Sequence, residues 1–420
     1  MPRRCSPTCS LTPRRSSANS TPAAAGHVDT QTYAKPFCPP KSVICRNSYL
    51  RSSKLSSRRH SSSLNPISWG ITRCDCSWVG ECPQFLVQVR RLPSRTVRAI
   101  TITEYGGPAV LRLTEAPDPR PGPGEVLIDV VATSVNRADL LQRQGRYAPP
   151  PGVSEILGLE CAGTVAELGD EVSGFAVADE VCALLAGGSY AERVVAPAGQ
   201  VMPLPPGVDL VTAGGVPEVA CTVWSTVVRH AGLAAGELLL VHGGSGGVGT
   251  HAIQVGRALG AQVATTASAA RLARCAELGA QILIDYREQD FAEQLTGRAD
   301  VILDNMGAKY LSRNLTALAP DGRLIVIGLQ GGATAELNLG ALLPKRASVA
   351  AIGLRGRPVD GPHGKAALCA DVVARSWPMF GDGRVKPVVH ATVPLADAAQ
   401  AHQMLEAGGV VGKVLLVTRS

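Results

Sequence analysis

The chain has 420 residues, of which 45% are hydrophobic and 18% are charged, so it can bury the cores of two ordinary domains. Its 45 glycines and 30 prolines follow no Gly-X-Y period, which excludes a collagen-like protein. No apolar run approaches the roughly 18 residues that span a bilayer. Aromatic residues make up only 4% of the chain, which argues against a stacking platform for single-stranded nucleic acid.

Charge and cysteine content divide the chain near residue 95. Residues 1–95 hold 15 Lys and Arg against 3 Asp and Glu, whereas the rest of the chain holds 26 against 31. This acidic body gives no reason to expect nucleic acid as a main partner. Its five cysteines are scattered and odd in number, which is typical of a reduced, cytoplasmic protein.

The first 96 residues are rich in Ser, Arg and Pro and have no sustained apolar period, so we expect a disordered, basic extension. Three origins stay open for it. Residues from Val97 onward look like a natural amino terminus, which favours a start placed too far upstream. The alternatives are an organellar transit peptide and a functional arm that binds polyanions. Cys74, Cys76 and Cys82 match no zinc spacing well, so we expect no metal there.

Residues 97–216 predict a β-rich domain with Gly- and Pro-rich turns. Its expected strands are Val97–Thr103, Glu125–Thr133, Gly163–Leu168 and Glu180–Ala183. Over residues 217–346, strands and helices alternate, as they do in a doubly wound parallel sheet. The expected strands there are Glu237–Val241, Gln262–Thr266, Asp300–Leu303 and Arg323–Ile327, and the expected helices are Val248–Leu259, Ala270–Leu278 and Lys309–Leu318.

The alternation is lost after about residue 346. In residues 347–420 we expect a helix over Ala396–Glu406 and a final strand, Lys413–Thr418, that returns to the first domain. The sequence therefore predicts an α/β protein with a β-rich domain and a Rossmann domain.

A glycine-rich turn, Val241–Thr250, follows an expected strand and opens an expected helix. Within it, Gly244-x-Gly246-x-x-Gly249 has the spacing of a dinucleotide-binding loop. Glycine suits such a loop because the turn needs positive φ, and because the backbone must approach a diphosphate at the helix N-terminus. We therefore predict cofactor contacts from Gly244, Ser245, Gly246, Gly247, Val248 and Gly249.

The end of the next strand selects the nucleotide. NAD sites usually carry Asp or Glu about 20 residues beyond the loop, where it holds the ribose hydroxyls. Here the strand ends at Ser268 without an acid, and Arg271 follows. A hydroxyl and a guanidinium suit a 2′-phosphate, so the sequence predicts NADPH rather than NADH. Tyr286 is a candidate third contact, and the alternative is that Arg271 is only a solvated helix residue.

The body lacks a recognisable zinc site. It contains no Cys-x-x-Cys, and its six histidines form no pair at metal-ligand spacing. We therefore expect no alcohol oxidation through a zinc alkoxide. The chemistry that remains is hydride transfer to an acceptor that is already electrophilic, such as a quinone or an activated alkene.

These features together resemble the zinc-free quinone oxidoreductases of the medium-chain dehydrogenase/reductase superfamily, over residues 97–418. The chain is similar above all to the NADPH:quinone oxidoreductases that a tumour-suppressor protein induces in animals. The resemblance rests on the glycine turn and on Asn136–Gly145, Leu157–Gly163, Pro217-Glu218, Gly328–Gly332 and Gly412-Lys413.

The resemblance implies a GroES-like catalytic domain (97–216), a Rossmann NADPH-binding domain (217–346) and a return segment (347–420) that completes both. It implies a homodimer with Asn136 and Tyr147 beside the nicotinamide. It also implies that the nicotinamide end of the cofactor packs against the segment that contains Gly328 and Leu329, and that Lys413 helps to hold the cofactor. Zinc-dependent relatives would carry Cys and His ligands at Asn136 and Leu159. Glu160 is expected to be a structural carboxylate.

Two other functions stay open. One is an enoyl-thioester reductase on the same fold, for which Arg355 and Arg357 are candidates to hold a long carrier arm. The other is a non-catalytic NADPH-binding protein, used structurally or as an RNA-binding redox sensor. We expect a small-molecule substrate, no membrane partner and a cytoplasmic location.

Overall fold

The computed structural model describes residues 95–418, which belong to one compact unit. The predicted disordered extension, residues 1–96, lies outside the described residues except for its last two positions. The cysteines considered there for a metal also lie outside them.

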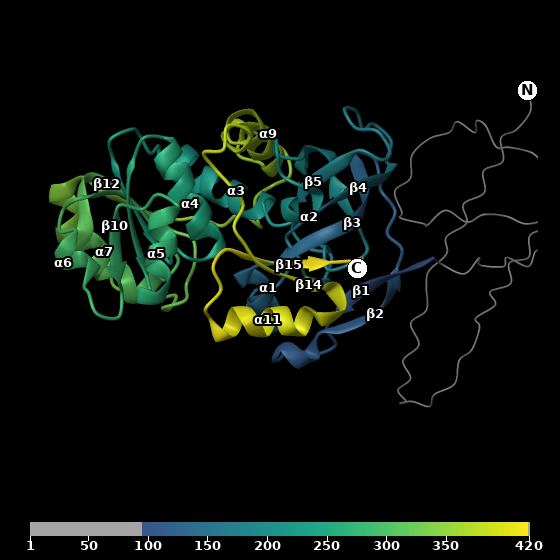
Figure 1. The fold of residues 1–420 in the computed structure, drawn as a ribbon, viewed down its shortest axis with the longest axis horizontal. Coiled ribbons are helices and arrows are strands. Elements are labelled where there is room, and N and C mark those ends of the chain that lie inside the picture. Colours follow the sequence, from purple (N-terminus) through teal and green to yellow (C-terminus); the bar gives the residue numbers. More distant parts are fainter. Residues whose placement is uncertain (1–94, 419–420) are drawn as a thin grey trace, which may run out of the picture. The chain divides into compact units, whose positions relative to one another are not determined.

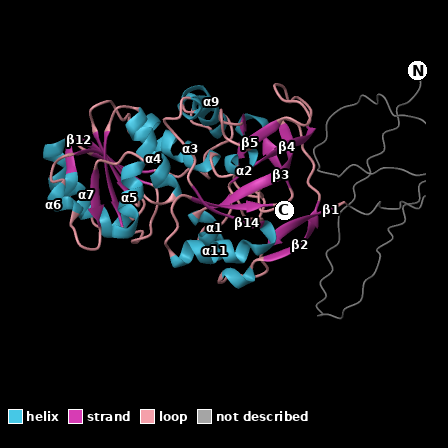
Figure 2. Cartoon of the chain, viewed as in Figure 1, coloured by secondary structure: helices cyan, strands magenta, loops and turns pink. Residues whose placement is uncertain are grey.

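The first domain is built on a strand pair and a seven-stranded, mostly antiparallel sheet (Figure 2). Its strands up to residue 203 are β1 (Thr96–Thr101), β2 (Arg112–Pro117), β3 (Glu125–Val135), β4 (Glu160–Leu168), β5 (Glu180–Leu184), β6 (Arg193–Pro197) and β7 (Val201–Pro203). The strands β1 and β2 pair with each other, and the long β3 pairs with both β4 and β6. All four strands expected in this domain are present, with shifted ends.

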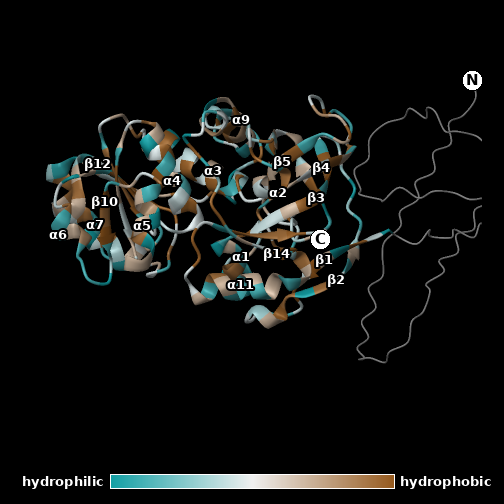
Figure 3. Ribbon diagram, viewed as in Figure 1, coloured by the Kyte–Doolittle hydropathy of each residue, from teal (hydrophilic) through white to brown (hydrophobic). Residues whose placement is uncertain are grey.

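The second sheet has six parallel strands in the order β10-β9-β8-β11-β12-β13. They are β8 (Leu238–His242), β9 (Gln262–Ala267), β10 (Ile282–Asp285), β11 (Ala299–Asp304), β12 (Leu318–Val326) and β13 (Ser348–Ala351). Counted along the chain this order is 3-2-1-4-5-6, which confirms the predicted doubly wound sheet. The central strands β8 and β11 are almost completely buried and mostly apolar, as expected for strands covered on both faces. The neighbouring β10 is drawn largely in brown in Figure 3.

Helices cover both sheets. The α-helices are α1 (Arg137–Arg143), α2 (Leu210–Ala213), α3 (Pro217–Val223), α4 (Gly247–Ala258), α5 (Ala269–Glu277), α6 (Phe291–Gln294), α7 (Leu311–Ala317), α8 (Leu339–Leu342), α9 (Lys365–Arg375), α10 (Trp377–Gly381) and α11 (Ala398–Ala407). A π-helix, Trp224–His230, continues α3. Short 3-10 turns occupy Pro108–Val110, Ala198–Gln200, Gly307–Tyr310, Leu343–Lys345 and Leu395–Asp397. Within residues 95–418, none of the helices has the length and apolar character needed to cross a membrane.

Two expectations differ from the structure. The predicted helix Lys309–Leu318 begins as a 3-10 turn, and Leu318 already belongs to β12. Between residues 347 and 395 the sequence predicted no regular element, yet β13, α9 and α10 lie there. The buried residues of α9 include Leu368, Cys369 and Val372, whose spacing is that of one face of a helix and would have indicated this element.

The chain returns to the first domain at its end. Strand β15 (Lys413–Val417) pairs antiparallel with β3 and parallel with β14 (Val389–Pro394), as Figure 1 shows in yellow beside blue. Just before β15, Gly412 bridges to Gly246 in the glycine turn. Lys413, the first residue of β15, therefore lies next to the glycine turn, where the two sheets approach each other.

Candidate active site

The glycine turn joins β8 to α4 at the carboxyl edge of the parallel sheet. Only Gly243 within it has a positive φ, +69°, so the expectation of left-handed backbone holds for that residue alone. A Cβ at Gly249 would collide with the carbonyl oxygen of Gly243, and one at Gly244 would collide with Thr265. Glycine at these two positions is required by close packing rather than by φ.

The turn fits a diphosphate. A Cβ placed on Gly246 would meet nothing closer than the Gly243 oxygen at 3.5 Å, so glycine leaves open space at this position. Gly246 is the N-cap of α4, and the next three residues begin the helix. Their N–H groups have no partner within the helix and lie at its positive end. The N–H groups of Gly247, Val248 and Gly249 would therefore hold the anionic centre of a dinucleotide, whereas the N–H of Gly246 donates to the Gly243 oxygen at 3.0 Å.

The three residues predicted to select the nucleotide lie at neighbouring strand ends. Ser268 follows β9 as the N-cap of α5, and Tyr286 follows β10 with 43% of its surface exposed. The Nη1 atom of Arg271 lies 3.4 Å from Oγ of Ser245 in the glycine turn. The structure thus brings a cation and two hydroxyl-bearing residues to one edge of the sheet, beside the turn.

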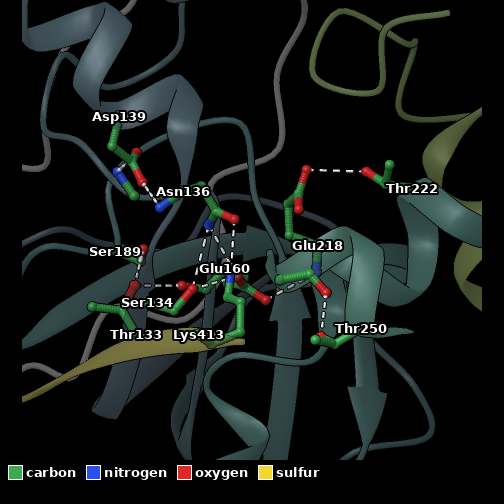
Figure 4. A network of polar contacts seen from close by, with 12 residues as sticks. Thr133, Ser134, Asn136, Asp139, Glu160, Ser189, Glu218, Thr222, Thr250 and Lys413 are labelled. Atoms are coloured by element: carbon green, nitrogen blue, oxygen red, sulfur yellow. Dashed lines mark hydrogen bonds and ion pairs between the residues drawn. The ribbon is translucent and has the colours of Figure 1, made fainter. Parts of the chain in front are cut away.

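A buried polar cluster lies across from this turn (Figure 4). Lys413 donates from Nζ to Oδ1 of Asn136 at 2.6 Å and to Oε1 of Glu160 at 2.8 Å. Asn136 donates from Nδ2 to the same Glu160 oxygen at 2.9 Å. All three side chains are at most 8% exposed. A Cβ on Gly247 would lie 2.6 Å from the Lys413 side chain, so the lysine also touches the turn.

Four donors hold the carboxylate of Glu160. Besides Lys413 and Asn136, it accepts a hydrogen bond from Oγ of Ser134 at 2.5 Å and one from the backbone N–H of Glu218 at 2.9 Å. A carboxylate offers about four acceptor sites. Three of the four donors reach Oε1 and one reaches Oε2, so both oxygens are held in place, which supports the structural role expected of Glu160.

The amide of Asn136 is held in one orientation. Its Oδ1 accepts from Lys413, and its Nδ2 reaches both Glu160 and, more weakly at 3.3 Å, the hydroxyl of Ser134. Its backbone N–H donates to Asp139, which forms the capping box at the start of α1. Burial raises the pKa of Asp139 to about 7, against the hydrogen bonds from Asn136 and Gly158.

Tyr147 lies below a buried cation. The guanidinium carbon of Arg355 is 5.2 Å from its ring centroid, within the range of a cation–π contact. Arg355 is 5% exposed and donates to Gln142 at 2.8 Å and to the carbonyl of Ala186 at 2.6 Å. It is therefore not an exposed cation that could hold a carrier arm. Burial raises the pKa of Tyr147, and the charge of Arg355 opposes this rise.

The segment predicted to face the nicotinamide follows β12. The backbone of residues 327–332 is hydrogen-bonded to the turn after β11, for example from Gly331 N–H to the Met306 oxygen at 2.7 Å. Gly328 approaches that turn so closely that a Cβ would lie 2.8 Å from the carbonyl oxygen of Asn305. Leu329 is 57% exposed.

Sequence reasoning missed a buried network beneath the glycine turn. His242 contacts Thr266 at 3.1 Å through Nδ1 and Asn314 at 2.8 Å through Nε2. Asn314 donates to Asp304 at 3.1 Å, and the Thr266 hydroxyl accepts from the N–H of Gly243 at 3.3 Å. Burial lowers the pKa of His242 to about 4, which keeps it neutral. This network ties the turn to the end of β11, and only His242 next to the motif could have signalled it.

No metal cluster occurs in the described part of the chain: there, no three His, Cys, Asp or Glu side chains are arranged to hold an ion. Where zinc-dependent relatives are expected to carry ligands, this chain has the amide of Asn136 and the buried aliphatic Leu159.

Comparison with known proteins matches both domains. Residues 122–206 match the family model described as the alcohol dehydrogenase GroES-like domain, and residues 278–416 match the one described as zinc-binding dehydrogenase. The quinone oxidoreductase of Rattus norvegicus is 31% identical over 332 residues, which are 77% of this chain and 98% of the relative. The human synaptic vesicle membrane protein VAT-1 homolog is 30% identical over 339 residues, 76% of this chain and 86% of that protein.

A solved structure shares this fold as well. It is a mycobacterial protein complexed with NADPH, 30% identical, with a TM-score of 0.67 over 76% of this chain and 99% of its own. Both domains are matched in order, and the rat relative is covered almost from end to end, which confirms the predicted GroES-like and Rossmann domains. The chain belongs to the medium-chain dehydrogenase/reductase superfamily, in which the quinone oxidoreductases are its homologues.

Proposed function

We propose that this oxidoreductase transfers a hydride from NADPH to quinones or other conjugated carbonyl compounds without a metal ion. The observation that carries the proposal is the position of Lys413. The aliphatic part of its side chain touches the glycine turn at Gly247, and its Nζ donates hydrogen bonds to Asn136 and Glu160. The glycine turn and a buried polar cluster that contains a lysine–glutamate ion pair are therefore adjacent. Relatives named quinone oxidoreductase and a neighbour complexed with NADPH support the choice of reactants.

Bound NADPH would supply the hydride, and the chain's own residues would supply position and charge. The weakest hydrogen bond of the Asn136 amide is the one that Nδ2 donates to Ser134 at 3.3 Å. The carbonyl oxygen of a quinone can replace Ser134 as the partner of this N–H group. The adjacent charge of Lys413 would stabilise the negative charge that develops on that oxygen. Ser268, Arg271 and Tyr286 would bind the 2′-phosphate end. Gly328 and Leu329 would pack at the nicotinamide end.

Tyr147 has two possible roles, stacking on the acceptor or relaying a proton to it. A Tyr147→Phe variant keeps the ring and removes the hydroxyl. If the hydroxyl relays the proton, kcat with a quinone is expected to fall by about 10², with little change in the Kd for NADPH. Steady-state rates and cofactor fluorescence measure the two quantities. An unchanged kcat would leave stacking as the role of Tyr147.

The proposal is tested by mixing the full-length protein with NADPH and following the loss of absorbance at 340 nm with several quinones and, in parallel, crotonyl-CoA. We expect oxidation with quinones, and no loss of rate after treatment with a chelator. Preference for crotonyl-CoA would support the enoyl-thioester reductase. Binding of NADPH without oxidation by any acceptor would support a non-catalytic protein, and RNA binding by the same preparation would then be measured.

The proposal includes a cytoplasmic homodimer. The outer edge of β13 has no strand partner in residues 95–418, and unpaired edges readily pair with another chain. Near this strand, Leu339 and Leu343 are 69% and 81% exposed. Apolar surface of this kind is typical of an interface. Light scattering of the purified chain is expected to give twice the mass of the monomer.

A further inference from the structure

Asn305 lies at the topological switch point of the parallel sheet. It directly follows β11, and β11 pairs with β8, which leads into the glycine turn. On either side of this pair the chain order runs in opposite directions, and ligands of such sheets bind in the crevice outside these strand ends. A Cβ on Gly243 would lie 2.6 Å from Nδ2 of Asn305, so this amide borders the turn itself.

The backbone around Asn305 is fixed. Asp304 accepts hydrogen bonds from the N–H groups of Met306 at 2.6 Å and Gly307 at 3.1 Å, which closes the turn that carries Asn305. The carbonyl oxygen of Asn305 accepts from the N–H of Gln330 at 3.3 Å. The side chain is thus placed between the two loops predicted to bind the cofactor, the glycine turn and residues 328–332.

The side-chain oxygen of Asn305 has no partner. Oδ1 is buried, and no residue among 95–418 donates a hydrogen bond to it. Most buried side-chain polar atoms are paired, and an unpaired acceptor costs about 1–3 kcal/mol. An amide oxygen can only accept, so the missing partner is a donor. Phosphate oxygens at pH 7 accept, whereas the hydroxyl groups of a ribose donate.

We infer that Asn305 is a cofactor-binding residue whose Oδ1 accepts a hydrogen bond from a ribose hydroxyl on the nicotinamide half of the coenzyme. This inference rests on the proposed function. The nicotinamide half is assigned because β11 is the first strand of the second mononucleotide-binding half of the sheet. Neither the glycine spacing nor the resemblance predicted this contact.

The test is an Asn305→Leu variant of the full-length protein, which has a similar volume and no polar atoms. We expect the Kd for NADPH, measured by nicotinamide fluorescence, to rise by about tenfold, which corresponds to roughly 1.4 kcal/mol. Binding of adenosine 2′,5′-diphosphate, which lacks the nicotinamide half, is expected to be unchanged in a competition assay. The unfolding temperature of the cofactor-free variant is expected to equal or exceed that of the wild type, because an unpaired buried acceptor is gone.

A matched control is Ser376→Ala, which removes another buried, unpaired oxygen at the junction of α9 and α10. It should leave both nucleotide affinities unchanged. The inference is overturned if Asn305→Leu binds NADPH as well as the wild type does, or if it weakens NADPH and the fragment equally. A lower unfolding temperature of the cofactor-free variant would also overturn it, since Oδ1 would then have a partner in the free protein. If the wild type binds no nicotinamide nucleotide, the proposed function itself fails.

Discussion

A Lys413→Met variant is expected to lose about 3 kcal/mol of unfolding free energy. Lys413 is the only cation within salt-bridge distance of Glu160 among the described residues, and that carboxylate is completely buried. Without the lysine, the buried carboxyl group of Glu160 has no counter-charge and is supported only by neutral donors. Urea unfolding at pH 7, with the midpoint and slope compared with the wild type, measures the loss.

The double variant Lys413→Met/Glu160→Gln is the control for this effect. It removes both charges and keeps a group that can bind Ser134 and Asn136. If the loss arises from an uncompensated carboxylate, the double variant should be more stable than Lys413→Met alone. Equal or lower stability of the double variant would instead show that the packing of the lysine stem against the glycine turn accounts for the loss.

The same substitution should also affect the reaction. Asn136 loses the donor that fixes its Oδ1, and the cluster loses the charge assigned to stabilising the acceptor oxygen. We expect kcat/KM for NADPH oxidation by a quinone to fall by about 10² to 10³, the range observed when one preorganised donor is removed. The measurement is made at a temperature where the variant is folded, as judged by its circular dichroism. A kcat/KM equal to that of the wild type would show that Lys413 does not contribute to the reaction.

The contrast between the glycine turn and this cluster shows what the sequence could predict. The turn is local: its glycines, the preceding strand and the following helix are contiguous, so spacing alone indicated a diphosphate site. The Glu160–Lys413 ion pair joins residues 253 positions apart, and no periodicity connects them. The same holds for Asn305, whose significance comes from an unpaired buried oxygen and from its proximity to Gly243, which lies in the glycine turn after β8. Local pattern predicted the strands and helices next to the glycine turn, whereas the side-chain partners could be identified only from the packing of both sheets.

An Arg271→Glu variant is expected to lower the preference for NADPH over NADH by about 10² or more. The guanidinium stands 3.4 Å from Ser245, at the strand end where a 2′-phosphate would lie. Removing a charged hydrogen-bond donor costs about 1.5–3 kcal/mol, and the new carboxylate repels the phosphate. The same carboxylate can accept from the free ribose hydroxyls of NADH, as acidic residues do in NAD sites. The ratio of kcat/KM for the two cofactors measures the change.

The matched control is Arg274→Glu on the same helix. Arg274 is one turn further on, is exposed and pairs with Glu277 at 2.5 Å, so the substitution makes the same change in net charge away from the glycine turn. If the selectivity arises from direct contact with the 2′-phosphate, this variant should keep the wild-type ratio at physiological ionic strength, where charges more than about 8 Å apart are largely screened. If Arg274→Glu shifts the ratio as much as Arg271→Glu does, the preference arises from the overall field of α5. If neither variant shifts it, Arg271 is a solvated helix residue and the nucleotide is selected elsewhere.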